Sequence, residues 1–200
     1  MMQRDILIAV SGGILSAVAS MTIVLGLPGA LLFAYLAPLP LIMVGLALGL
    51  RMATIAAAAG VVVAGLLEST FNAGLYGLIH AVPGVLVVRY ALSLEAQADG
   101  TSKWASPGLV LSWLSILAAG LFTAAVMIVF EAETGIEDEI YGKLSQVFAV
   151  MVPNLDEGQR TIIVSSLAAI FPGALGTSWI IMIAANATLA QRLVTKLGKN

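Results

Sequence analysis

Cysteine is absent from this 200-residue sequence, histidine occurs once, and charged residues make up only 10% of the chain. Without cysteine, the sequence excludes disulfides, thiolate chemistry and cysteine-bound metals. A soluble domain carries roughly 25% charged residues, so the scarcity of charge excludes an ordinary soluble protein. The nine basic residues are scattered along the chain, without the clustered patch that follows a phosphate backbone. We therefore expect no nucleic-acid partner.

Familiar catalytic motifs are missing as well. The sequence has no HExxH motif, no GxSxG motif and no Walker glycine loop. Zinc proteolysis, serine hydrolysis and ATP hydrolysis commonly use these patterns. We therefore expect a protein that is not an enzyme, with no catalytic residue, no cofactor, no metal site and no ATPase of its own.

Hydrophobic residues are abundant: they form 60% of the chain, and the mean hydropathy is +1.04. A helix needs about twenty mainly apolar residues to cross a bilayer. The first apolar run is too long for the core of a signal peptide, so we interpret it as a retained helix. We predict an all-α polytopic helical bundle that forms a single membrane domain over residues 1–200. Its six spans are expected at 6–25, 30–50, 53–71, 75–92, 108–130 and 161–189.

The positions of the basic residues predict the orientation of these spans. If the N-terminus is cytoplasmic, the outer side receives only Lys143 and Arg160. This asymmetry follows the positive-inside rule. We expect a multi-pass protein of the bacterial inner (cytoplasmic) membrane with both termini cytoplasmic, and an external acidic loop at 131–160 that contains an interfacial helix at 140–152. The basic residues expected on the cytoplasmic side are Arg4, Arg51, Arg89, Lys103, Arg192, Lys196 and Lys199.

Prolines are expected to interrupt two of the spans. Pro38 and Pro40 lie inside the second apolar run, and Pro172 lies inside the sixth. Proline lacks an amide donor and disfavours helix in the residue before it. The motif predicts non-helical backbone between Ala37 and Leu41, or a simple kink. Irregular backbone at membrane depth is tolerated only where protein or a water-filled cavity surrounds it.

Small residues recur every four positions in the first span, at Ala9, Gly13 and Ala17. Such a row lets another helix approach closely. The row predicts either packing within the bundle or docking of a separate membrane subunit, and the sequence leaves both readings open.

One stretch gathers polar groups in a chain that otherwise avoids them. LLESTFNAGLYGLIH, residues 66–80, contains Glu68, Asn72, Tyr76 and the only histidine, His80. We interpret it as a hairpin between the third and fourth spans. Glu68 is then expected about one turn below the outer end, Asn72 at the tip and His80 one to two turns down the next span.

This stretch has two readings. It is a plain turn if Glu68 reaches water and His80 satisfies a neighbouring hydrogen bond. It is an outward-facing polar pocket if both side chains face the interior, as ionisable groups in membrane spans usually do. In the second reading Glu68 and His80 pair or share a ligand, and aromatic walls come from Phe71, Tyr76 or Trp179.

The motif FAYLAPLPLIMVGLALGLR, residues 33–51, follows a first span rich in small residues and precedes an alanine-rich third span. In this pattern the chain resembles the YybS-like family of uncharacterised predicted membrane proteins. That family is similar in outline to the S components of energy-coupling factor transporters, which are six-helix bundles carrying vitamins or metal ions. The resemblance implies a cavity open to the outside. It also implies docking of a transmembrane coupling subunit, which works with an ATPase, on Ala9, Gly13 and Ala17.

Members of the YybS-like family usually continue past the sixth span with further helices, whereas this sequence stops at RLVTKLGKN. The sequence is then either a short relative or a truncated piece of a longer one. Two functions are expected as alternatives. The first is S-component-like capture and uptake of a small solute. The second is a non-transporting scaffold or partner subunit in a cell-envelope complex, docking through its helix faces.

Overall fold

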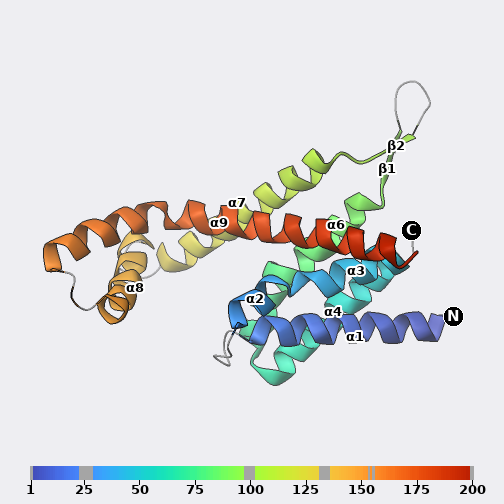
Figure 1. The fold of residues 1–200 in the computed structure, drawn as a ribbon, viewed down its shortest axis with the longest axis horizontal. Coiled ribbons are helices and arrows are strands. Elements are labelled where there is room, and N and C mark those ends of the chain that lie inside the picture. The colour runs from blue at the N-terminus through green and yellow to red at the C-terminus, as the bar shows by residue number, and fades with distance from the viewer. Residues whose placement is uncertain are drawn as a thin grey trace. The chain divides into compact units, whose positions relative to one another are not determined.

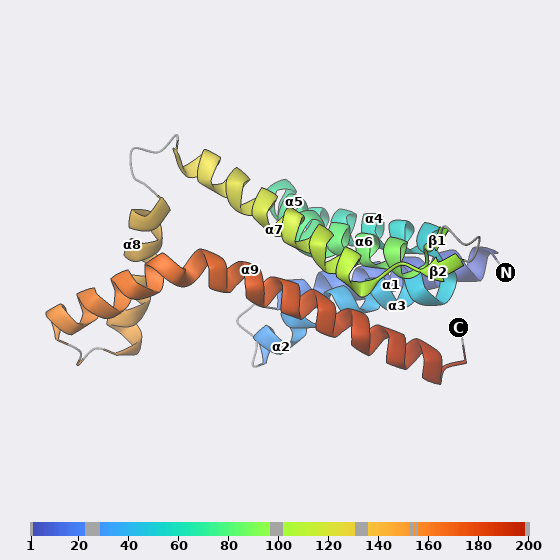
Figure 2. The ribbon, with the colours of Figure 1, turned by 90° about the horizontal axis from the view of Figure 1, so that it is seen from above.

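The computed structural model describes residues 2–22, 29–96, 102–130, 136–152, 154 and 156–198. Helices make up most of this part of the chain (Figures 1 and 2). The chain divides into two compact units. The first unit comprises Met1–Ser112 with Ile181–Asn200, and the second comprises Trp113–Ile180.

Six helical stretches in the described residues are long and apolar enough to cross a membrane. This finding confirms the prediction of an all-α polytopic bundle with six spans. A short antiparallel hairpin of β1 (Leu94–Ala96) and β2 (Ser102–Trp104) joins the fourth span to the fifth and was not predicted. The helices are α1 (Met2–Met21), α2 (Ala30–Tyr35), α3 (Pro38–Leu48), α4 (Leu50–Leu67), α5 (Thr70–Tyr76), the π-helical turn η1 (Gly77–Ala81), α6 (Val82–Ala91), α7 (Pro107–Phe130), α8 (Ile136–Met151) and α9 (Glu157–Lys196).

The second span is interrupted where α2 ends and α3 begins, and Leu36 and Ala37 form the turn. Pro38 and Pro40 have no N–H group to offer the carbonyls four residues before them. These two carbonyls accept bonds from donors three residues away: Ala34 from the Ala37 N–H at 3.2 Å, and Leu36 from the Leu39 N–H at 3.0 Å. The interruption expected from this proline motif is therefore present.

The sixth span differs from the expectation of a broken helix. α9 continues through Pro172 as one helix of 40 residues. Proline removes a single backbone donor, and the bonds of the neighbouring residues hold the helix together on both sides. Membrane helices tolerate such prolines because local adjustment satisfies the freed carbonyl.

The fourth span contains a wider turn, η1, between α5 and α6. The Val82 N–H bonds the Gly77 carbonyl five residues earlier, which is the π-helical pattern. Pro83 follows directly, and it offers no N–H to the preceding turn while its ring crowds that turn, which favours the wider π-helical turn here. The extra residue in the turn accommodates the proline and places His80 inside η1.

α1 and α4 lie against each other at van der Waals distance. A Cβ added at Gly13 would clash with the Ala56 carbonyl and lie 2.9 Å from the Gly60 nitrogen, so only glycine fits there. Ala9 and Ala17 are fully buried on either side of Gly13. The row of small residues in the first span therefore packs inside the first unit, where α4 covers it.

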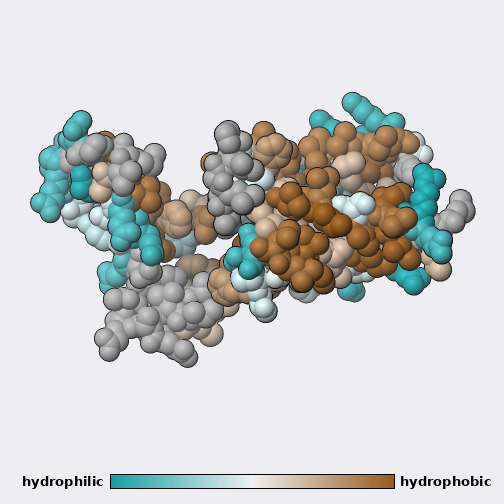
Figure 3. All heavy atoms as spheres, turned by 90° about the horizontal axis from the view of Figure 1, so that it is seen from below, coloured by the Kyte–Doolittle hydropathy of each residue, from teal (hydrophilic) through white to brown (hydrophobic). Residues whose placement is uncertain are grey.

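The surface carries many large apolar side chains. In the second unit Ile116, Ile162, Ile170 and Leu175 are each at least 60% exposed, and a water-soluble protein would bury most such groups. Figure 3 shows hydrophobic residues over much of the visible surface. This surface suits a protein that is surrounded by lipid chains.

Candidate functional site

A chain of hydrogen bonds connects α1, α5 and the α2–α3 turn inside the first unit. The Tyr76 hydroxyl donates to Ser16 Oγ at 2.7 Å, and Ser16 Oγ donates to the Ala37 carbonyl at 2.6 Å. Ser16 is fully buried and Tyr76 is nearly so. An unpaired polar group is costly in a membrane interior, so these three residues stabilise one another.

Glycine makes room for this arrangement. A Cβ at Gly60 would clash with the phenol ring of Tyr76, so the absence of a side chain at Gly60 allows the ring to lie against α4. Gly12 plays the same part for α3, because a Cβ there would lie 2.7 Å from Val44 Cγ2. The close approach of α1, α3 and α4 thus brings Ser16 within reach of Tyr76.

Asn186 of α9 holds the α2–α3 turn from another direction. Its Nδ2 donates to the Tyr35 carbonyl at 2.6 Å and to the Met182 carbonyl at 2.8 Å. In an unbroken helix the Leu39 N–H would bond the Tyr35 carbonyl, but here that N–H bonds Leu36. Asn186 supplies the missing donor. It is buried, and within the described residues its Oδ1 has no hydrogen-bond partner.

His80 lies beside Tyr76, with ring centroids 5.6 Å apart and the ring planes inclined at 50°. Its Nδ1 is buried and has no hydrogen-bond partner in the described part of the chain. Buried polar atoms without a partner are rare in proteins and call for a ligand, a water or a functional role. π-Helical turns such as η1 also occur frequently at functional sites.

Glu68 and Asn72 occupy other positions relative to the tip of the hairpin than predicted. α4 ends at Leu67, and Ser69 caps α5 by accepting the Asn72 N–H at 3.1 Å. The tip of the hairpin is therefore at Glu68 and Ser69, and the placement of the tip at Asn72 was wrong. A serine oxygen is a good N-cap, which explains why the helix starts earlier than expected.

This correction changes the position of His80 in the fourth span. The fourth span comprises 22 residues, Thr70–Ala91, and His80 lies ten residues after its start. At 1.5 Å per residue that is about 15 Å from the end of this helical stretch, near its middle rather than close to Glu68. Within the described residues Glu68 and His80 form neither a hydrogen bond nor an ion pair.

The other predicted site residues separate into different places. Phe71 is 74% exposed, so its ring does not line an interior pocket of the first unit. Trp179 belongs to the second unit, whereas Tyr76 and His80 belong to the first. Of the tentative binding residues, the structure thus brings Tyr76 and His80 into contact.

Sequence reasoning missed the hydrogen bonds that Ser16 and Asn186 form with the backbone at the α2–α3 turn. A polar side chain within an apolar span was the available signal, because such residues usually face other helices. Serine and asparagine are, however, common enough in membrane helices that this signal does not identify the partner. Their partners, Tyr76 and Tyr35, lie 60 and 151 residues away in the sequence.

The groups that this site presents are hydrogen-bonding groups. No group of three or more His, Cys, Asp or Glu side chains in the described residues is arranged to hold a metal ion. Ser16 Oγ is engaged by Tyr76 and Ala37, so it is not placed beside a base as a nucleophile would be. The site offers an imidazole nitrogen and an amide oxygen.

Comparison with known proteins adds a family but no function. No curated protein and no solved structure matches the chain. The family model described as "Predicted membrane protein (DUF2232)" matches residues 14–200. The match covers nearly the whole sequence, and the six apolar helices agree with a membrane location. The chain is therefore a multi-pass membrane protein that belongs to the DUF2232 family of predicted membrane proteins.

Proposed function

We propose that the protein captures a small solute in the interior of its first unit and takes part in solute uptake in the manner of an S component, without an energy source of its own. The observation that carries this proposal is the buried Nδ1 of His80, which lacks a partner beside Tyr76. A polar group of a solute would satisfy this nitrogen. Ionisable residues inside membrane spans commonly mark ligand paths.

The surroundings of His80 support the proposal further. Tyr76 is oriented by Ser16, and Ser16 is bonded to the α2–α3 turn. A ligand that engages His80 would therefore lie beside a side chain of fixed orientation, and fixed groups bind at a lower entropic cost. The irregular backbone of η1 and of the α2–α3 turn gives this region polar groups that a regular bundle lacks.

The test is recovery of a small molecule from purified protein. The full chain would be purified in lipid nanodiscs, extracted with solvent and compared by mass spectrometry with empty nanodiscs. We expect one compound enriched with the wild-type protein and lost with His80→Leu. His80→Asn retains a polar atom near the position of Nδ1, so it should retain part of the compound.

A structural control separates binding from folding. Thr123→Val removes an exposed hydroxyl that bonds only its own helix, at the Ala119 carbonyl, and it should leave recovery unchanged. If the wild-type protein carries no enriched compound, or if His80→Leu carries as much as wild type while remaining folded, the solute proposal fails.

The face first suggested for a coupling subunit is occupied within the first unit. Ala9, Gly13 and Ala17 are buried against α4, so a separate subunit does not reach them without displacing that helix. If a coupling subunit and its ATPase are partners, as the uptake proposal requires, they dock elsewhere. Co-purification with envelope proteins, with no bound compound, would favour the scaffold.

The orientation belongs to the same proposal. We propose that both termini face the cytoplasm in the inner membrane, because the basic residues expected on that side greatly outnumber those expected outside. Reporter tags at both termini should then report cytoplasmic, and a tag between Gly135 and Glu139 should report external. Opposite labelling of the two termini would refute the arrangement.

A further inference from the structure

The exposed face of α9 changes character along the part that lies in the first unit. The opposite face is buried there, through Ile183, Asn186, Ala190 and Val194. On the exposed face Ile181 is 62% exposed, but polar and charged side chains predominate from Thr188 onward. A change from apolar to polar exposure along a membrane helix marks the boundary of the hydrocarbon layer. The last two turns of α9 are therefore at the level of lipid headgroups.

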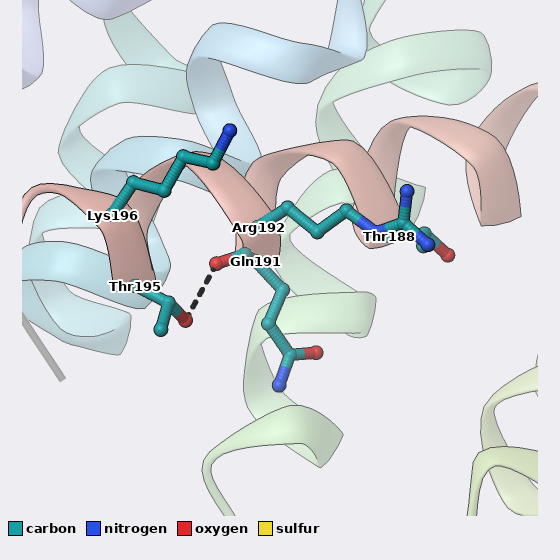
Figure 4. Close-up of a pocket in the computed structure, with 5 residues that line it drawn as sticks. All are labelled: Thr188, Gln191, Arg192, Thr195 and Lys196. Atoms are coloured by element: carbon teal, nitrogen blue, oxygen red, sulfur yellow. Dashed lines mark hydrogen bonds between the residues drawn. The ribbon is translucent and has the colours of Figure 1, made fainter.

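A wide-open, shallow cavity of about 600 Å³ lies at this level on the surface of α9, and all of its lining residues belong to that helix: Thr188, Gln191, Arg192, Thr195 and Lys196. Figure 4 shows these side chains together on α9, with the Arg192 side chain extending along the helix toward Thr188. The hydroxyls of Thr188 and Thr195 each donate to a carbonyl of α9 at 2.9 Å. The donors that remain for a ligand are the Arg192 guanidinium, the Lys196 ammonium and the Gln191 amide.

The two cations of the cavity have no counter-charge among the residues that the structure describes. Arg192 and Lys196 lie four residues apart, where like charges on a helix repel each other. Neither forms an ion pair or a hydrogen bond through its side chain with any residue that the structure describes. An anion in the cavity would offset both charges at once.

We propose that this cavity binds the phosphodiester of an anionic lipid headgroup. Basic pockets at the membrane boundary are suited to such headgroups, and the planar fork of arginine matches two phosphate oxygens. Two positive charges favour a lipid with net negative charge over a zwitterionic one. The acyl chains would continue along the apolar exposed face of α9 at Leu189 and Ile181, which a free phosphate ion would not use.

The test uses the purified full chain in detergent micelles. Phosphatidylglycerol, phosphatidylcholine and inorganic phosphate would be titrated separately, with bound lipid counted by native mass spectrometry. We expect phosphatidylglycerol to bind in preference to phosphatidylcholine. The double variant Arg192→Gln, Lys196→Gln should weaken phosphatidylglycerol binding by roughly 10- to 30-fold, since each cation near a membrane surface contributes about fivefold.

Two further variants make the result decisive. Arg51→Gln removes an exposed arginine at the start of α4 that does not line the cavity, and it should change binding less than about twofold if the site is local. Arg192→Lys retains the charge but not the planar fork, so it should fold normally and bind phosphatidylglycerol a few-fold more weakly. This variant tests the site even if the double variant does not fold.

Three outcomes would overturn the proposal. The first is that the double variant binds phosphatidylglycerol as tightly as wild type. The second is that Arg51→Gln weakens binding as much as the double variant does, which would indicate a diffuse surface charge. Alternatively, millimolar inorganic phosphate displaces the lipid completely, which would indicate a site for a free anion.

Discussion

The two units of the protein use glycine in opposite ways. In the first unit an added Cβ at Gly13 would clash with the backbone of α4, and one at Gly45 would clash with the side chain of Val88. In the second unit a Cβ at Gly120 or Gly173 would meet no atom within 4 Å. Glycines thus mark close helix contacts in the first unit, whereas these glycines of the second unit mark none.

The serine hydroxyl groups named next also differ between the two units, in whether they bond another helix or their own. Ser16 of the first unit bonds across to another helix segment, at Ala37, and receives Tyr76. In the second unit Ser165 and Ser166 donate to carbonyls of their own helix, α9. The buried fraction of the spans shows the same difference between the units. Of the apolar stretch of each of the first four spans, 28 to 39% is buried, against 6% for α7.

The comparison teaches what holds membrane helices together. Lipid chains are as apolar as leucine, so apolar side chains alone do not drive helices into contact. Small residues that allow close van der Waals packing, and hydrogen bonds between helices, provide the attraction. The first unit has both, and the candidate site lies among these contacts.

The largest effect is expected from Gly13→Ala. The added carbon collides with backbone atoms of α4, which cannot rotate away as a side chain can, so overpacking should cost about 3 kcal/mol of unfolding free energy. Equilibrium unfolding in mixed detergent micelles would measure it. A cost under about 1 kcal/mol would mean that α1 and α4 are not in close contact.

A smaller loss is expected from Ser16→Ala. The change leaves the Tyr76 hydroxyl and the Ala37 carbonyl unpaired, which should cost about 1.5 kcal/mol. The matched control is Ser165→Ala, whose hydroxyl bonds only its own helix and whose removal should cost less than about 0.5 kcal/mol. Combining Ser16→Ala with Tyr76→Phe should be less than additive, because the two side chains share one bond.

Asn186→Leu should lower the free energy of unfolding by less still, about 1 kcal/mol. It removes the donor to the Tyr35 carbonyl, but it also removes the buried Oδ1 that has no partner. The effect should be local, so amide hydrogen exchange should increase around the α2–α3 turn and stay unchanged in α4. Unaltered exchange at the turn would show that Asn186 does not hold it.

The smallest effect is expected from Gly120→Ala in the second unit. The added carbon meets open space, and alanine favours helix over glycine by up to about 1 kcal/mol. The free energy of unfolding should therefore be unchanged or slightly higher. A strong destabilisation would show that Gly120 contacts another helix, and the contrast between the two units would fail.

Much of the fold was predictable from the sequence because it depends on local chemistry. Apolar length sets each span, and Pro38 and Pro40 together withhold two N–H donors from the preceding turn, so the number of spans and the interruption of the second followed directly. Pro172 was less informative, since one missing donor within a long helix does not have to end it. The tip of the 66–80 hairpin was misplaced because Ser69, rather than Asn72, caps the helix.

The sequence by itself determined that this protein is an apolar, helical membrane protein with six spans and a row of small residues on the first. The tertiary structure decided which helix covers that row, and that His80 lies in a π-helical turn beside Tyr76. It also decided that Tyr76 meets Ser16 and that Asn186 meets Tyr35. Those pairs are far apart in the chain, and lipid offers apolar side chains no preference among neighbours. Shape and hydrogen bonds between packed helices select the partners, and both exist only once the helices have assembled.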